Sequence, residues 1–235
     1  MALLIRSWNV FHGNSSPPGR RSHLRTMVEL ATADGPDVLC LQEVPLWALP
    51  RLGRWSRGMT ARWSVARRPW LPAWLGGAIT RLNQGLLRSA ISGQANAMLL
   101  RPPLRVLDHR ERQISEGPRE RRTCHAVRTP GLVVANLHAT NTFKRHDVPA
   151  AEIARAEALV DELAQEGDVC VLAGDFNLRA GELGPLPGWS PLGPGIDHVL
   201  VRGAASTLVA TWPEERRVVG GTVLSDHAPV ETRVG

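Results

Sequence analysis

Long apolar runs, paired cysteines and lysine are all scarce in this chain of 235 residues. No apolar run approaches the roughly 20 residues that a transmembrane helix needs, which excludes a helical membrane protein. The cysteines are three, an odd number, and Cys40, Cys124 and Cys170 each lie in an apolar stretch typical of a buried strand. We therefore interpret them as structural thiols, without a disulfide or a zinc site. The composition, 43% hydrophobic and 21% charged, is typical of one globular domain with a substantial core.

The N-terminal segment lacks the features of a secretory signal. The apolar residues Leu3, Leu4 and Ile5 are followed at once by Arg6, and no cleavage site of small residues comes after them. We expect a first strand here and a cytoplasmic protein.

Positive charge is concentrated in one part of the chain. The net charge is +6, but residues 51–128 hold 16 arginines against 4 acidic residues, a charge of +12, whereas the remainder holds 12 basic against 18 acidic residues, a charge of −6. Four of the eight tryptophans lie in the same stretch. This pattern predicts a surface for a polyanion such as nucleic acid, or for an anionic membrane surface where tryptophan lies among the headgroups. Because lysine occurs only as Lys144, genome composition is an alternative source of the arginines.

The most specific form of this hypothesis concerns residues 62–70. Arg62, Arg67 and Arg68 lie close in sequence to Trp63 and Trp70. On one surface they could meet successive phosphates while the indoles stack on bases. We expect a single domain over residues 1–235, with a basic, tryptophan-rich insertion at about 51–95; no protein partner can be inferred.

Apolar periodicity predicts many strands and few helices. The expected strands are 3–9, 37–42, 96–100, 123–128, 132–138, 169–174, 198–202, 207–211 and 229–234. The expected helices are 20–35 and 150–166, with a third amphipathic candidate at 78–91 that would pack on the sheet or contact a membrane. Several strands are too apolar to have a solvated face, which favours two packed sheets with helices outside.

Strand after strand ends or begins in a carboxylate, amide or imidazole. The segments are Trp8-Asn9, Leu41-Gln42-Glu43, Asn136-Leu137-His138, Gly174-Asp175-Phe176-Asn177, Ile196-Asp197-His198 and Ser225-Asp226-His227. Polar groups at strand ends converge on one edge of a sheet, where sites in layered α/β proteins are usually built. The asparagine, glutamate, aspartate and histidine side chains of these segments, with no nucleophilic serine or cysteine among them, suit a hard cation and an activated water molecule.

Together with Asn96-Ala97-Met98-Leu99, these segments resemble, in order, the signature blocks of the endonuclease/exonuclease/phosphatase superfamily, from Asn9 to Val230. The superfamily includes deoxyribonuclease I, abasic-site endonucleases, neutral sphingomyelinases and inositol polyphosphate phosphatases. The resemblance implies an α/β fold, a four-layer α/β/β/α sandwich of two packed sheets flanked by helices. This agrees with the two-sheet interpretation.

The resemblance also implies a metal site. Glu43 matches the family's main metal-ligating carboxylate, Asn9 the amide beside the same Mg²⁺ ion, and Asp226 an additional ligand to metal or water. Mn²⁺ is a possible substitute for Mg²⁺. At His12-Gly13, where other members place a second acid, this chain has none, so the resemblance does not extend to a second metal.

Catalytic roles follow from the same matches. Asp175 resembles the residue that orients or deprotonates the attacking water, and Asn177 the amide that donates to a non-bridging oxygen. Asp197 and His227 resemble a carboxylate–imidazole pair at the scissile phosphate. His138 matches a histidine near the leaving oxygen, a candidate general acid.

Two substrate-binding candidates remain open. Arg122 is our choice for a phosphate contact, although Arg119 and Arg121 compete with it. Asn141 could bind substrate or close a turn.

The expected function is Mg²⁺-dependent hydrolysis of a phosphoester by direct water attack, with nucleic acid as the preferred substrate. The alternative is a phospholipid or inositol/sugar phosphodiesterase or phosphatase with the tryptophan-rich insertion at a membrane surface. A binding module without catalysis is disfavoured, because it would have no use for Glu43, Asp175, Asn177 and His227 together.

Overall fold

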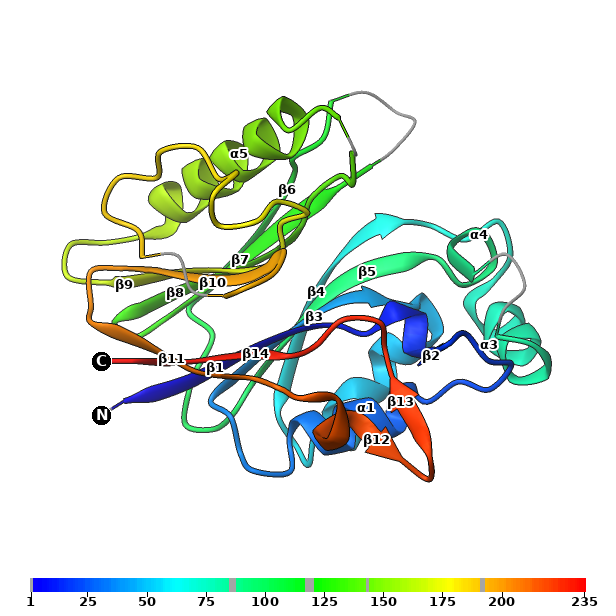
Figure 1. Ribbon diagram of the computed structural model, residues 1–235. Helices are drawn as coiled ribbons and strands as arrows, with labels where there is room; N and C mark the ends of the chain where they lie inside the picture. Colours follow the sequence, from blue (N-terminus) through cyan, green and yellow to red (C-terminus); the bar gives the residue numbers. More distant parts are fainter. Residues whose placement is uncertain (1, 85–87, 117–120, 143, 191–192) are drawn as a thin grey trace.

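Two twisted β-sheets pack face to face in the computed structural model, which describes residues 2–84, 88–116, 121–142, 144–190 and 193–235 (Figure 1). The first sheet has six strands in the order β11 (Ser206–Thr211), β14 (Val230–Val234), β1 (Leu3–Asn9), β3 (Val38–Val44), β5 (Gln94–Leu100) and β4 (Thr60–Arg67). The second has five in the order β10 (Asp197–Arg202), β9 (Val169–Asp175), β8 (Leu132–His138), β7 (Thr123–Thr129) and β6 (Asp108–Gln113). A small sheet joins β12 (Val218–Val219), β13 (Thr222–Leu224) and β2 (Ser15–Ser16).

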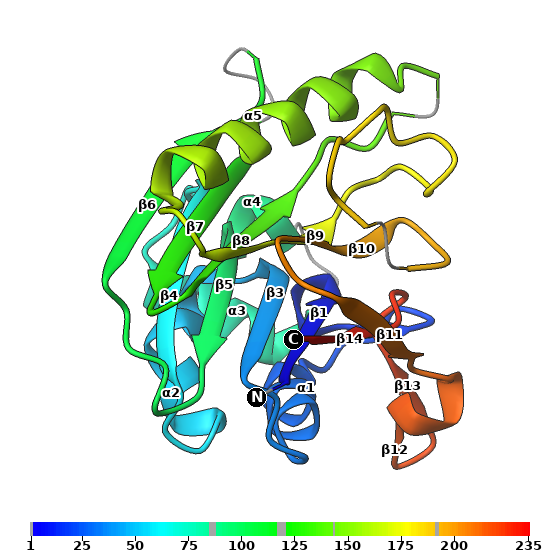
Figure 2. The same cartoon turned by 90° about the vertical axis from the view of Figure 1, so that its left-hand side faces the viewer.

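Helices cover the outer faces of the sheets. The α-helices are α1 (Leu24–Ala31), α2 (Leu52–Trp55), α3 (Ala73–Leu82), α4 (Arg88–Ser92) and α5 (Asp147–Leu163). Short 3₁₀-helices occur at η1 (Phe11–Gly13), η2 (Leu46–Arg51) and η3 (Glu214–Arg217). Figure 2 shows α5 on one side of the paired sheets and α1 on the other. No described helix is both long and apolar enough to cross a bilayer.

Three buried apolar clusters correspond to the three interfaces between these layers. Side chains of β1, β3 and β5 meet those of β7, β8, β9 and β10 in the central cluster, which includes Ile5, Met98 and Val171. Residues of α5 such as Ile153 pack on the outer face of the second sheet, and residues of α1 such as Met27 pack on the first. The predicted four-layer α/β/β/α architecture is therefore confirmed.

Buried polar contacts cross the central interface at several points, and one of them joins two side-chain amides. Gln42 of β3 donates from Nε2 to Oδ1 of Asn136 on β8 at 2.8 Å. Asn136 donates in turn to the carbonyls of Leu41 and Ala97 at 3.1 and 2.9 Å. Both side chains are fully buried, so these hydrogen bonds are shielded from competing water.

The sequence-based elements differ from the structure mainly in one helix and two edge strands, and the short elements α2, β2, β12 and β13 were not predicted either. The single helix expected at 78–91 is wrong: α3 begins earlier, after Pro72, and the chain leaves helical geometry at Asn83. Strands β4 and β6 were not predicted, because they lie at sheet edges and lack a regular apolar face. All three cysteines are buried and free, as expected.

Candidate active site

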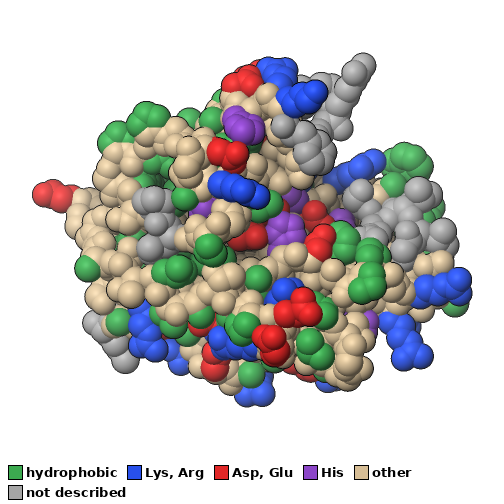
Figure 3. Space-filling view, in the orientation of Figure 1, with side chains coloured by type: hydrophobic (Ala, Val, Ile, Leu, Met, Phe, Trp, Pro, Cys, Tyr) green, Lys and Arg blue, Asp and Glu red, His purple; other side chains and the backbone are tan. Residues whose placement is uncertain are grey.

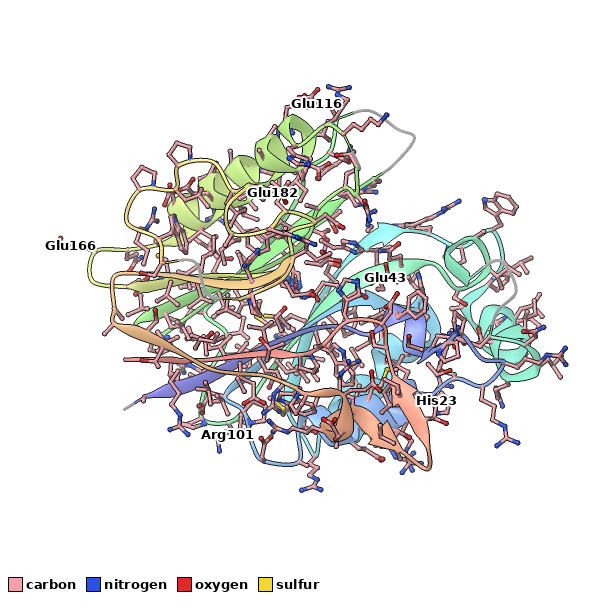
Figure 4. The ribbon with its side chains drawn as sticks, in the orientation of Figure 1. His23, Glu43, Arg101, Glu116, Glu166 and Glu182 are labelled. Carbon is pink, nitrogen blue, oxygen red and sulfur yellow. The ribbon has the colours of Figure 1, made fainter. Side chains whose placement is uncertain are left out.

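The side chains singled out at strand ends lie at one edge of the paired sheets. β1 runs parallel to β3, and β8 runs parallel to β9, so the carboxyl ends of each pair coincide. Asn9 of the first sheet donates from Nδ2 to Oδ2 of Asp175 in the second at 3.0 Å. Figure 3 shows histidine and acidic side chains at the surface along this junction, and Figure 4 places Glu43 there.

Asp175 occupies the centre of this edge. Its side chain is 2% exposed, and Oδ1 accepts a hydrogen bond from the backbone N–H of Asn177 at 3.0 Å. Gly174 permits this position, because a Cβ atom there would lie 2.0 Å from the carbonyl oxygen of Leu137 on β8. Asn177, at φ +50°, donates from Nδ2 to the carbonyl of Ala139 at 2.9 Å, which ties the ends of β8 and β9 together.

Asp197 and His227 form a hydrogen-bonded pair beside Asp175. Oδ2 of Asp197 lies 2.8 Å from Nδ1 of His227, and Nε2 of His227 lies 3.9 Å from Oδ2 of Asp175. The loop that carries His227 is held by Ser225, whose hydroxyl donates to the carbonyl of Asn9 at 2.7 Å and accepts from the N–H of His227.

The charges of this group are linked. Burial and the charge of Asp197 raise the pKa of Asp175 to about 7, although the positive charge of His227 acts in the opposite direction. Burial lowers the pKa of His227, but its hydrogen bond to Asp197 and the nearby carboxylates outweigh burial and raise it to about 10. At neutral pH His227 is therefore an imidazolium, and Asp175 retains its proton to a higher pH than an exposed aspartate does.

His138 is in a different state from His227. It is almost fully buried, and burial together with the charge of Arg122 holds its pKa well below the ordinary value. Nε2 lies 3.2 Å from Nη1 of Arg122 and 3.5 Å from Oδ2 of Asp175, while Nδ1 lies 3.1 Å from Nε2 of Gln94. His138 is therefore neutral at pH 7 in the free protein.

Glu43 is directed by an irregularity of its strand. The register between β3 and β5 shifts between Leu41 and Val44, and Glu43 has φ +57°, an uncommon value for a residue other than glycine. Such bulges redirect side chains at functional edges of sheets. The carboxylate lies 3.3 Å from Nε2 of His12 and is 19% exposed.

Among the described residues, Asp175, Asp197 and His227 form a group whose potential ligand atoms all lie within 4.8 Å of one another. The imidazolium of His227 already balances these carboxylates, and its Nδ1 is engaged with Asp197. We therefore interpret this trio as a proton-bearing network. The carboxylate of Glu43 and the amide oxygen of Asn9 are the better donors for a hard cation.

The other candidates from the sequence lie at the periphery of this group of residues. Asp226 is exposed and lines a hollow of about 320 Å³ together with Asp197 and His227. Asn141 is exposed in the segment after β8. Arg122 contacts His138, Arg121 is exposed, and Arg119 lies outside the described residues.

The structure corrects one part of the hypothesis of a basic surface over residues 62–70, namely the placement of Arg62 beside Trp63. Arg62 and Trp63 are neighbours on β4, and successive side chains of a strand point to opposite faces. Arg62 acts electrostatically on His109 in the second sheet, whereas Trp63 is 38% exposed. The two side chains therefore do not share a surface.

Part of the regional charge excess is also neutralised in three dimensions. Arginines of residues 51–128 form ion pairs with acids outside that stretch, namely Arg101 with Asp37, Arg112 with Glu162, and Arg128 with Asp168. The charge counted along the sequence therefore overstates the charge available to a ligand.

Several contact residues were missed in the sequence. His12 and Gln94 touch Glu43 and His138, and Ser225 holds the His227 loop. His12 and Ser225 adopt positive φ angles. Such angles are expected from a sequence mainly at glycine, so neither turn could be recognised from these residues. Only the proximity of Ser225 to Asp226-His227 pointed to it.

Comparison with known proteins gives the family. The model of the endonuclease/exonuclease/phosphatase family matches residues 7–227. No curated protein sequence matches the chain. Among solved structures, TDP2 from Caenorhabditis elegans is 17% identical to this chain, with a TM-score of 0.71. The superposition covers 100% of this chain and 74% of the TDP2 chain.

Two bacterial structures are similar as well. A mannosyl-6-phosphatase from Bacteroides thetaiotaomicron is 14% identical with a TM-score of 0.69, over 99% of both chains. An endonuclease/exonuclease/phosphatase from Beutenbergia cavernae is 17% identical with a TM-score of 0.70, over 99% of this chain and 71% of its own. These structures share the fold of this chain. The family match extends over most of the sequence, so the chain is a member of the endonuclease/exonuclease/phosphatase family, whose enzymes hydrolyse phosphoester bonds.

Proposed function

We propose that this protein is a divalent-metal-dependent phosphodiesterase that cleaves nucleic acid by direct attack of water on phosphorus. The observation that carries the proposal is the environment of Asp175. Its carboxylate is buried, oriented by Asn9 and Asn177, and has a pKa of about 7. A positioned base whose pKa is near the working pH is well suited to take a proton from water.

The donor set fits a magnesium ion. Glu43 and Asn9 offer oxygen ligands, the carboxylate is reachable from solvent, and Mg²⁺ keeps several waters when bound by one or two carboxylates. Mn²⁺ accepts the same oxygen ligands. An ion held there would supply positive charge to the phosphate oxygens. Asp226 is a further candidate ligand.

The residues of the second sheet perform the proton and charge chemistry in this proposal. Asp175 accepts a proton as the water oxygen bonds to phosphorus, and the ester bond to the leaving oxygen breaks. His227, kept cationic by Asp197, donates from Nε2 to an oxygen of the phosphate, where negative charge accumulates. Asn177 has a second amide hydrogen for the same purpose, because only one is used on Ala139.

His138 is assigned to the leaving oxygen. A bound phosphate places negative charge beside it and thereby raises its pKa from the low value in the free protein. In that state it can deliver a proton to the leaving alkoxide, with Arg122 contacting the phosphate. Nucleic acid as substrate is supported by Arg122 at the site and by the net charge of +6.

A phospholipid or sugar phosphoester is the second candidate. Trp70, Trp74 and Leu82 are 77%, 73% and 83% exposed, which is typical of side chains that meet a membrane or another partner. The structurally similar mannosyl-6-phosphatase has the same fold. An anionic vesicle surface is the partner that this candidate implies.

The experiment that tests the function is a substrate screen. Purified protein with Mg²⁺, with Mn²⁺ or with chelator is incubated with duplex DNA, abasic DNA, single-stranded DNA, RNA, sphingomyelin and inositol phosphates. We expect metal-dependent cleavage of a nucleic acid. Cleavage confined to a lipid or sugar phosphate would replace the first candidate with the second, and hydrolysis that persists in chelator would refute the metal requirement.

A further inference from the structure

A groove of about 550 Å³ is lined in part by the segment that follows β3, the strand that carries Glu43. Its lining includes three tryptophans and three arginines and no acidic residue: Trp47, Trp55, Trp74, Arg25, Arg51 and Arg81. We call it the tryptophan groove. The groove is formed by η2, α2 and α3 with the start of α1, and these residues were not recognised together in the sequence.

The groove is linked to the surroundings of Glu43 by a short stretch of chain and by a hydrogen bond. Glu43 is the penultimate residue of β3, and the chain enters the groove lining three residues later at Leu46. After the end of α3, Gln84 donates from Nε2 to the carbonyl oxygen of His12, which contacts Glu43. Figure 1 shows α3 beyond the end of β3 at which Glu43 lies. The groove therefore lies on the same side of the site as Glu43.

The floor of the groove is tightly packed around Trp47. The rings of Trp47 and Trp55 meet edge to face at 6.2 Å, and the guanidinium of Arg51 lies 5.8 Å from the Trp47 ring. A Cβ atom on Gly77 would lie 3.3 Å from Trp47, so α3 passes directly against the indole. The Nε1 atom of Trp47 is buried and has no hydrogen-bond partner among the described residues.

The side chains at the rim of the groove are exposed, unlike those of its floor. Trp74 is 73% exposed although it lies in the first turn of α3, so fold packing does not account for this indole. Arg81 is exposed and contributes a positive charge on the same helix. Arg25 is partly balanced by its ion pair with Glu29, while no acid of the lining balances Arg51 or Arg81.

This combination indicates an anionic ligand with flat rings. A choline headgroup would suit the indoles but would be repelled by the arginines. Indoles stack on bases only where the bases are unpaired, because the faces of paired bases are covered by their neighbours in a duplex. Arginine beside a stacking platform is the arrangement by which proteins hold single strands.

We propose that the tryptophan groove binds an unpaired nucleotide next to the scissile phosphate, with its base on Trp74 and its phosphate at Arg81. This inference rests on the proposed function, since it specifies which form of nucleic acid the same site accepts. The protein then selects single-stranded or frayed substrate over continuous duplex.

The test measures binding without turnover. Fluorescence anisotropy of a labelled oligothymidylate is followed in chelator with full-length protein, Trp74→Ala, Arg81→Gln and the matched control Trp70→Ala. Trp70 is 77% exposed and does not line the groove. We expect Trp74→Ala to weaken single-strand binding by about tenfold or more and Trp70→Ala to have no effect. Arg81→Gln is expected to reduce the slope of log affinity against log salt by about 0.7.

The outcomes separate this proposal from the function on which it rests. Binding of the same strand annealed to oligoadenylate should be weaker and insensitive to Trp74→Ala. If the wild type binds and cleaves nucleic acid but Trp74→Ala behaves like Trp70→Ala, the groove proposal is wrong and the proposed function stands. If Trp74→Ala loses adsorption to anionic phosphatidylserine vesicles instead of DNA binding, the groove faces a membrane and the proposal is overturned. If the wild type neither binds nor cleaves any nucleic acid, the proposed function itself fails.

Discussion

Asp197 and His227 lie thirty residues apart in sequence, yet Oδ2 of the first and Nδ1 of the second are joined at 2.8 Å. One residue begins β10 in the second sheet, and the other lies in the loop before β14 in the first. The pair therefore fixes the imidazole at the junction of the sheets, with its second nitrogen toward Asp175.

The first prediction concerns pH dependence. With Asp175 ionising near pH 7 and His227 losing its proton near pH 10, kcat/KM of the wild type should rise through about 7 and fall through about 10. Asp197→Asn removes a negative charge that raises both pKa values, so both limbs of the profile should move to lower pH. The measurement is the pH dependence of kcat/KM on a small diester. A profile of Asp197→Asn that superimposes on that of the wild type would contradict the electrostatic coupling of these residues.

The second prediction concerns the base. Asp175→Asn keeps the size of the side chain and removes its proton-accepting charge, and we expect a loss of about 10²- to 10⁴-fold in turnover. The fold should persist, because a neutral group replaces a buried charge. Thermal unfolding followed by circular dichroism checks the fold. Near-normal turnover on every substrate of the wild type would show that another group activates the water.

The third prediction concerns His138. Proton donation matters for poor leaving groups, so His138→Ala should reduce the rate on an alkyl diester by about 10²- to 10⁴-fold. The loss should shrink on a nitrophenyl diester, whose leaving group scarcely needs a proton. Equal losses on both substrates would assign His138 a positioning role.

The fourth prediction concerns the metal. Glu43→Gln removes the carboxylate from the proposed ligand set, and we expect a higher Mg²⁺ concentration for half-maximal activity. Glu166→Gln is the matched control, because Glu166 is exposed and Figure 4 places it far from Glu43. Mg²⁺ titrations that superimpose for both variants and the wild type would exclude Glu43 as a ligand.

The fifth prediction concerns Arg217, which is 8% exposed and donates from Nη1 to three backbone carbonyls at 3.0 to 3.1 Å. These carbonyls belong to Leu224, Ser225 and His227, so the arginine holds the loop that carries the imidazole. Arg217→Leu should lower the free energy of unfolding by about 3 kcal/mol and reduce kcat more than KM. Arg217→Lys should recover part of both, as measured by urea unfolding and steady-state kinetics.

Much of the fold follows from the sequence, because buried strands carry continuous apolar runs. The predicted bounds of β1 and β8 agree with the structure. β6, with the sequence DHRERQ, pairs with β7 through its backbone and carries no apolar side chain. Such an edge strand is recognisable only from its partner. The arrangement of α3 depends on contacts of Gly76 and Gly77 with Ile91 and Trp47, which local periodicity does not encode.

The site was predictable to the extent that strand ends determine it. Asn9, His138 and Asp175 terminate parallel strands, so their convergence follows from the order of elements. The contacts of His12 and Gln94 depend on a tight turn and on an antiparallel neighbour, and local sequence specifies neither. The tryptophan groove was missed for a related reason, since its residues come from separate short helices.

The buried contact between Gln42 and Asn136 has a mechanical consequence. Most side chains of the central interface are apolar, and their burial alone has no directional preference, so the fit of the packed side chains and a few buried polar contacts determine how the two sheets are offset. A hydrogen-bonded amide pair defines a single relative offset of the two sheets, since any displacement leaves buried polar groups without partners. Gln42 is the residue before Glu43, and Asn136 lies two residues before His138. The same amide pair therefore helps to fix the spacing between Glu43 in the first sheet and His138 in the second.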